Sequence, residues 1–263
     1  MDIFTDDRLP DSYALCLLGH GSRDPEGNEE FMVLWQKLRE RNFCQITEAG
    51  FLEFAKPTVA EALSTCQSNG IKNIIILPSI LFSGEHTQRD IPDTIREVFR
   101  DHPEINLIFS EPLGTQPEIM EVCQARIKEG EKLSQKSILR SETLLMIVGH
   151  GSRDTDFNSQ VDKNLFQLGK KLGFGKTIIC FAGTSQHSLE DMQEKFDPQG
   201  FHRVILLPFF LFTGVWVKRV HGLADTFQKK YPDIEFLKAP CLKHHDIIVN
   251  TLIQRARKSV FNK

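Results

Sequence analysis

The sequence predicts an α/β protein built from two tandem, duplicated domains, each a small parallel sheet flanked by helices. Two observations lead to this fold class. Short apolar runs rich in Ile, Leu, Val and Phe alternate with longer helical patterns, as expected for a parallel sheet covered on both faces. The hexapeptide Gly-His-Gly-Ser-Arg-Asp also occurs twice, at 19–24 and at 149–154, so that His20 in the first half corresponds to His150 in the second.

The repeat extends well beyond the hexapeptide. Leu77-Pro78 matches Leu207-Pro208 with the same offset that separates His20 from His150. Similarity spread over a whole half of the chain indicates a duplicated domain rather than a shared motif. We therefore expect domains at 1–133 and 143–263, joined by a polar linker at 134–142.

The elements of the first half follow from its apolar pattern. Ile74-Ile75-Ile76-Leu77 is the clearest strand, because it is a short, continuous apolar run. Pro57 stands where a helix would begin its first turn, and Gly70 stands where that helix would end. The expected strands are 14–19, 44–52, 72–79 and 105–110, and the expected helices are about 26–41, 58–68, 86–100 and 116–133.

The second half repeats this order of strands and helices. Its buried-strand pattern again lacks the alternation of a half-exposed sheet. The expected strands lie near 143–149, 177–182, 203–209 and 234–238, and the expected helices lie near 156–172, 188–196, 217–230 and 243–260.

Composition and charge exclude several classes of protein. The chain of 263 residues is 40% apolar and 25% charged, which is typical of a water-soluble globular protein. Its net charge of −3 offers no electrostatic attraction to nucleic acid or to an anionic membrane. No apolar run approaches the roughly 20 residues that span a bilayer, and the acidic N-terminus lacks the pattern of a signal peptide. We expect a cytoplasmic protein.

The six cysteines predict neither a metal cage nor a cluster. None forms a C-x-x-C pair, and their separation in sequence does not suggest a zinc or iron–sulfur site. Cys16, Cys44 and Cys180 lie in or beside apolar runs, so we expect buried, unreactive thiols.

Three chemically useful side chains follow strands of the first half. His20 follows the first strand, Glu53 follows the second, and His86 lies in the loop after the third. Ligands of open parallel sheets bind beyond the carboxyl ends of the strands, where these side chains would meet. Neutral imidazole is a good ligand for a borderline divalent cation, and a carboxylate or imidazole can also accept protons.

Each of these residues also has a purely structural interpretation. His20 could be a hydrogen-bonded residue at a strand end, and His86 could be a solvated residue at a helix start. Glu53 could cap the helix that begins near Pro57 or pair with Lys56. The duplication of the hexapeptide favours a functional role for His20. The sequence around it contains no G-x-S-x-G, G-x-G-x-x-G or P-loop pattern, so dispersed metal ligands are the chemistry that remains.

Three segments taken together resemble the CbiX/SirB family of class II chelatases. They are Gly19 to Arg23 after a strand, Phe51 to Leu63 (FLE-x-A-x-P) and Leu77 to Pro92 (LP-x-x-LF-x-G-x-H). The resemblance covers nearly all of the first half and, more loosely, the second. It implies a lyase that inserts a divalent metal ion, cobalt or ferrous iron, into sirohydrochlorin on the route to cobalamin or siroheme.

The resemblance also implies roles for individual residues. His20 and His86 would bind the incoming metal and accept pyrrole protons, and Glu53 would assist as a third ligand or base. The metal is then a substrate, so no retained cofactor is expected. The macrocycle would bind between two such domains, which a duplicated chain supplies by itself, so we expect a monomer with an internal pseudo-dimer rather than a homodimer.

The second half departs from the family pattern. It keeps His150, but Trp216 matches His86, and Gly183 matches Glu53. We therefore expect one complete metal site and one degraded site, with Trp216 forming part of the wall against the flat macrocycle. The residues expected to contact that substrate are Ser22, Arg23, Trp216 and His150. The alternative function is a non-catalytic carrier of metal or tetrapyrrole on the same fold.

Overall fold

The computed structural model describes residues 8–81, 92–93, 95–97, 100, 102–152, 154–182 and 189–261. The chain forms two compact units. Unit 1 contains residues 1–114 and 244–263, and unit 2 contains residues 115–243.

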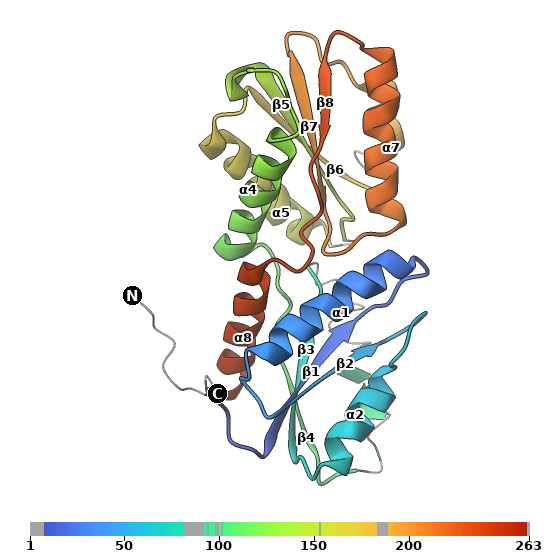
Figure 1. The fold of residues 1–263 in the computed structure, drawn as a ribbon, viewed down its shortest axis with the longest axis vertical. Helices are drawn as coiled ribbons and strands as arrows, with labels where there is room; N and C mark the ends of the chain where they lie inside the picture. The colour runs from blue at the N-terminus through green and yellow to red at the C-terminus, as the bar shows by residue number, and fades with distance from the viewer. Residues whose placement is uncertain are drawn as a thin grey trace. The chain divides into compact units, whose positions relative to one another are not determined.

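Unit 1 is built on a sheet of four parallel strands in the order β2-β1-β3-β4 (Figure 1). The central strand β1 is buried on both faces. Its residues Ala14, Cys16 and Leu18 belong to one core cluster with helix α2, while Leu15 and Leu17 are equally buried on the opposite face. The elements are β1 (Tyr13–Gly19), α1 (Pro25–Glu40), β2 (Ile46–Phe51), α2 (Val59–Ser68), β3 (Asn73–Pro78), β4 (Asn106–Phe109) and α8 (Asp246–Phe261).

Unit 2 repeats this sheet, with four parallel strands in the order β6-β5-β7-β8. Leu144, Met146 and Val148 of β5 pack in a cluster with α7 and the start of α6. The elements are α4 (Pro117–Glu131), η1 (Arg140–Glu142), β5 (Thr143–Gly149), α5 (Thr155–Leu172), β6 (Lys176–Phe181), α6 (Leu189–Lys195), β7 (Arg203–Phe209), α7 (Val215–Lys230) and β8 (Glu235–Lys238).

The structure confirms the predicted fold class and places the described strands and helices within a few residues of their predicted bounds. The helix predicted at 86–100 lies largely outside the described residues. Within that range residues 92–93 and 95–97 are helical, and Ile95 is fully buried in the unit 1 core.

The structure divides the chain differently from the predicted domains at 1–133 and 143–263, because two helices are exchanged. Helix α4 follows the first sheet in sequence but packs on β7 and β8 of unit 2, whereas α8 packs on β3 and β4 of unit 1 (Figure 1). Both helices carry an apolar stripe that must cover a sheet. The stripe specifies burial against some sheet but not which of two similar sheets, so sequence spacing could not reveal the exchange.

The segment 134–142, predicted as a linker, is fixed within unit 2. The buried guanidinium of Arg203 donates to Ser134 Oγ at 2.8 Å and to the carbonyl oxygens of Lys136 and Ile138 at 2.8 and 3.2 Å. It also pairs with Glu235 at 2.6 Å. Five donors in a planar fork can satisfy several acceptors at once, which is why one arginine holds this segment.

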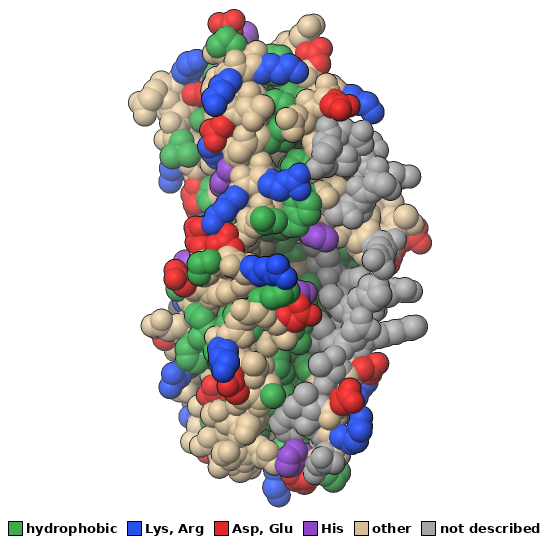
Figure 2. Space-filling model, turned by 90° about the vertical axis from the view of Figure 1, so that its right-hand side faces the viewer, with side chains coloured by type: hydrophobic (Ala, Val, Ile, Leu, Met, Phe, Trp, Pro, Cys, Tyr) green, Lys and Arg blue, Asp and Glu red, His purple; other side chains and the backbone are tan. Residues whose placement is uncertain are grey.

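The described surface carries charges of both signs, and the cysteines are buried as expected. Figure 2 shows acidic and basic side chains interspersed over the visible face, with no broad patch of one sign among the described residues. Within the described part of the chain no helix is long and apolar enough to cross a membrane. All six cysteines are buried, and burial raises the pKa of Cys44, Cys66 and Cys180 to about 12.

Candidate functional site

His20 and Glu53 are brought together by strand pairing at the carboxyl edge of the unit 1 sheet. Strands β1 and β2 pair in parallel up to Gly19 and Phe51. The pairing continues past both strands, because Leu52 N donates to Gly19 O at 2.9 Å and Glu53 N donates to His20 O at 3.0 Å. Both side chains are exposed at this edge. The two predicted ligands therefore stand on adjacent strand ends.

The two glycines beside His20 allow close approach of other groups. Gly21 has φ +87°, and a β-carbon there would lie 2.9 Å from the carbonyl carbon of Glu53 and closer still to its oxygen. At Gly19 a β-carbon would lie 2.8 Å from the ring of Phe31 on α1. Only glycine fits such positions, so the Gly-His-Gly sequence fixes where His20 leaves the sheet.

An asparagine that sequence analysis missed holds the loop after His20. Asn28 accepts a hydrogen bond from Ser22 N at 2.9 Å and donates to Ser22 O at 2.8 Å. Asn158 makes the same pair of bonds with Ser152 in unit 2, at 2.8 and 2.6 Å. The two asparagines occupy equivalent positions of the repeat, with the offset of the two hexapeptides, so the repeat carried a signal that could have found them.

The hydroxyl of Ser22 has a local structural partner. It accepts a hydrogen bond from Asp24 N at 3.0 Å, and the Asp24 carboxylate in turn caps α1 by accepting from Glu26 N at 3.3 Å. A hydroxyl can still donate while it accepts. A contact between Ser22 and the substrate therefore stays a prediction.

Other residues fill the two structural roles considered for Glu53, which are capping α2 and pairing with Lys56. Thr58 caps α2 in a capping box with Glu61, and its hydrogen bonds lower the pKa of that carboxylate. Lys56 pairs with the same Glu61 at 3.9 Å. Glu53 neither caps α2 nor holds Lys56 in this arrangement, which leaves its carboxylate available at the sheet edge.

His86 lies outside the described residues. The chain leading to it leaves the same edge of the sheet, because Ser79 follows β3 and donates to Leu18 O through both its amide, at 2.8 Å, and its hydroxyl, at 2.7 Å. Among the described residues no group of three His, Cys, Asp or Glu side chains could hold a metal ion. Of the predicted ligand set, only His20 and Glu53 are described.

A second residue that sequence analysis missed lies beside His20. The ring of Phe54 is nearly parallel to the imidazole, at 21° and a centroid separation of 6.4 Å. The Arg23 guanidinium lies over the same ring, 5.1 Å from its centroid. No periodicity or motif marks position 54, so only the fold reveals this cluster.

Unit 2 assembles a similar cluster around its own histidine. Trp216, on the first turn of α7, meets His150 edge to face at 6.0 Å between ring centroids. Arg219 lies 4.8 Å over the Trp216 ring. His221 is bound to Ala239 O at 3.0 Å, whereas Gly183 and His187 lie outside the described residues.

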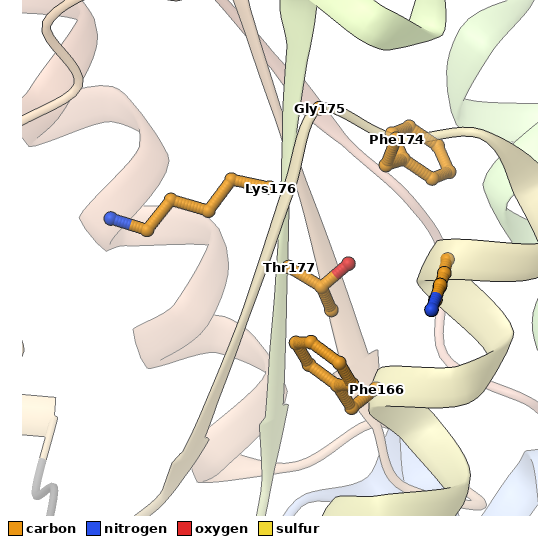
Figure 3. Close-up of a pocket in the computed structure, with 6 residues that line it drawn as sticks. Phe166, Phe174, Gly175, Lys176 and Thr177 are labelled. Atoms are coloured by element: carbon orange, nitrogen blue, oxygen red, sulfur yellow. The ribbon is translucent and has the colours of Figure 1, made fainter.

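Unit 2 also contains a cavity of about 320 Å³ beside β6. It is lined by residues of α5, the start of β6 and the turn between them. In Figure 3, Phe166, Phe174 and Thr177 border the cavity, while Lys176 points to the other side of the strand. The amino end of β6 lies opposite the sheet edge that carries His150, so the cavity includes none of the predicted site residues.

These features define a two-unit α/β protein that presents a glycine-flanked histidine at the carboxyl edge of each parallel sheet. The CbiX family model matches residues 14–130 and again residues 144–259. The chain therefore belongs to the CbiX family and contains that domain twice.

Similar proteins cover nearly the whole chain. A sirohydrochlorin cobaltochelatase of Priestia megaterium is 29% identical over 94% of this chain and 80% of its own length. A sirohydrochlorin ferrochelatase of the same organism is 24% identical over 95% of this chain and 91% of its own length. A sirohydrochlorin cobaltochelatase of Methanocaldococcus jannaschii is 33% identical, but 93% of its length matches only 41% of this chain.

The fold is also that of a solved structure, SirB from Bacillus subtilis with Fe3+. The two superimpose with a TM-score of 0.80 over 95% of this chain and 96% of that one, at 21% sequence identity. The architecture is thus shared although most side chains differ.

Proposed function

We propose that this protein is a sirohydrochlorin chelatase and that the His20 edge of unit 1 inserts a divalent metal ion into the macrocycle. The observation that carries the proposal is the hydrogen bond from Glu53 N to His20 O, which places an imidazole and a carboxylate on neighbouring strand ends. The reaction itself is inferred from membership of the CbiX family and from the activities of the similar proteins.

The chemistry needs groups that bind a metal weakly and accept protons. As the divalent ion enters, the two pyrrole N–H protons leave, so charge is conserved and nothing is oxidised or reduced. Neutral His20 can bind the ion through a ring nitrogen, and the Glu53 carboxylate can bind it or accept a proton. Oxygen and nitrogen ligands release the ion more readily than a thiolate cage would, which suits a metal that is a substrate.

His86 completes the proposed site. The support comes from the repeat, because Trp216 is offset from His86 as His150 is offset from His20. In unit 2 the Trp216 ring lies 6.0 Å from His150, so a histidine at the matching position of unit 1 would supply the second imidazole for His20. A tryptophan cannot ligate the ion. We therefore infer one working metal site, with Trp216 and His150 contacting the macrocycle.

Single substitutions test this assignment by metal insertion into sirohydrochlorin, followed by absorbance. We expect His20→Ala and His86→Ala each to lose at least about 100-fold in kcat, the scale of a lost acid–base group. His150→Ala, from the second hexapeptide, should raise KM for the macrocycle and keep kcat. Near wild-type rates in both unit 1 variants would contradict the proposal, and tight metal retention without turnover would indicate a carrier.

The physiological metal is a finer question, since similar proteins include both a cobaltochelatase and a ferrochelatase. Imidazole and carboxylate serve both ions, so metal supply can decide between them. Anaerobic rates with Co²⁺ and Fe²⁺ on the same macrocycle would distinguish the two activities.

We also propose that the protein acts as a monomer in the cytoplasm. This chain contains two CbiX domains, whereas a single-domain relative would have to pair two chains to bring two such domains together. Six buried cysteine thiols fit a reducing compartment. Light scattering on the purified protein should give the mass of one 30.1 kDa chain; a dimer mass would contradict the first part.

A further inference from the structure

Phe54 has a backbone conformation that a phenylalanine rarely adopts. Its φ is +62°, and a tight turn around it is closed by the hydrogen bond from Ala55 N to Glu53 O at 2.8 Å. Left-handed backbone is costly for a residue with a β-carbon, and glycine or asparagine usually occupies it. Strained residues of this kind gather at ligand-binding sites, where the surrounding structure holds them in place.

The side chain of Phe54 is exposed as well as strained. Its exposed fraction is 54%, although an aromatic ring gains free energy when it is removed from water. A single exposed phenylalanine is ordinary on a protein surface. Exposure and a left-handed backbone in one residue, next to the proposed metal ligand His20, are not explained by folding alone.

The neighbours of the ring provide charge and further flat surface. Arg23 lies 5.1 Å from the ring centroid, and the His20 imidazole is nearly parallel to the ring. A guanidinium over an aromatic face is held by cation–π attraction and keeps its donors free to pair with a carboxylate. The cluster therefore joins an apolar face, a cation and the proposed metal ligand.

The same combination occurs in unit 2 but is built from another element. There the aromatic ring is Trp216 on α7, with Arg219 over it and His150 at its edge. In unit 1 the ring comes from the segment between β2 and α2. Because the two positions are not equivalent in the repeat, duplication does not explain why both histidines have an aromatic and an arginine beside them.

We propose that Phe54 is a substrate-binding residue whose ring packs against the conjugated face of the tetrapyrrole, while Arg23 pairs with a carboxylate at its rim. The inference deepens the proposed function and rests on it. The ring would hold the macrocycle over His20, so its loss should weaken binding of the macrocycle more than it slows the chemical step.

Titration of metal-free sirohydrochlorin onto the protein, followed by absorbance, tests this directly. Phe54→Ala should raise the dissociation constant roughly five- to tenfold, the scale of one aromatic contact, and Phe54→Trp should stay within about twofold of wild type. Phe166→Ala is the matched control, since Phe166 is 51% exposed and lies on α5, and it should leave binding unchanged.

A further variant separates the ring from the strained backbone. Phe54→Gly removes the ring and suits the positive φ, so it should melt at or above the wild-type temperature and still bind the macrocycle weakly. Wild-type affinity in a folded Phe54→Gly would overturn the inference and leave the proposed function intact. Failure of the wild-type protein to bind sirohydrochlorin would instead overturn the proposed function itself.

Discussion

The carbonyl group of Glu53 occupies the space that a side chain on residue 21 would need. Gly21 has φ +87°, and a β-carbon built on it would overlap the Glu53 carbonyl. The second glycine of the hexapeptide thus sets the distance between the segment after β1 and the segment after β2. Since His20 precedes Gly21 directly, the glycine positions one proposed ligand relative to the other.

Gly21→Ala should damage both the site and the fold. The clash is with backbone, which cannot rotate away, so we expect a loss of about 2–4 kcal/mol in the free energy of unfolding. Metal insertion should fall with it. Urea unfolding and turnover measure the two effects.

Gly70→Ala is the matched control for that substitution. Gly70 also has positive φ, +74°, but no atom lies within 4 Å of the added carbon. Only backbone strain remains, about 1 kcal/mol, and turnover should be unchanged. Equal losses for the two glycines would show that the Glu53 carbonyl is not the cause.

Glu53→Ala should affect turnover, whereas Thr58→Ala should affect stability. Glu53 is exposed at the sheet edge, so its loss should lower turnover at least about 100-fold with little change in melting temperature. Thr58 caps α2, and its loss should cost about 1 kcal/mol of stability while turnover is kept. A Glu53→Ala protein that is fully active but less stable would assign Glu53 a structural role.

The exchange of α4 and α8 predicts where local unfolding occurs. Leu252 on α8 and Ile127 on α4 are both buried, and truncation of either should cost about 2–5 kcal/mol. In Leu252→Ala, amide hydrogen exchange should accelerate in β3 and β4, and in Ile127→Ala it should accelerate in β7 and β8. The reverse pattern would support the division of the chain into domains at 1–133 and 143–263.

Alkaline pH should destabilise the protein through its buried thiols. Burial raises the pKa of Cys66 from its ordinary value of 9.0 to about 12, and Cys44 and Cys180 shift in the same way. Above about pH 9 the unfolded chain loses thiol protons that the folded chain keeps. Because the unfolded state then binds fewer protons, the free energy of unfolding should fall as pH rises from about 9 to about 12.

Urea unfolding at several pH values under reducing conditions measures this slope. As a second readout, a thiol reagent at pH 8 should label the native protein slowly and the denatured protein at all six cysteines. Rapid labelling of the native protein would contradict the assignment of these thiols as buried and protonated.

Local pattern was enough to predict most of the fold. Continuous apolar runs such as Ile74 to Leu77 are found as strands buried on both faces, since their burial depends on their own composition. The internal repeat predicted a parallel sheet in each half, and the structure shows both sheets. It also shows that the two sheets share one strand order, which the sequence analysis did not specify. The pairing of α4 and α8 with their sheets was not predictable, because two similar sheets compete for each helix.

The same distinction between local pattern and tertiary contacts applies to the candidate site. The sequence by itself determined that a glycine-flanked histidine ends the first strand of each half and that Glu53 ends the second strand of the first half, because parallel strands bring their carboxyl ends to one edge. Only the tertiary structure decided what surrounds them: the Glu53 carbonyl against Gly21, Phe54 beside His20, and Arg23 over that ring. These contacts depend on backbone direction in loops, which hydrophobic periodicity does not encode.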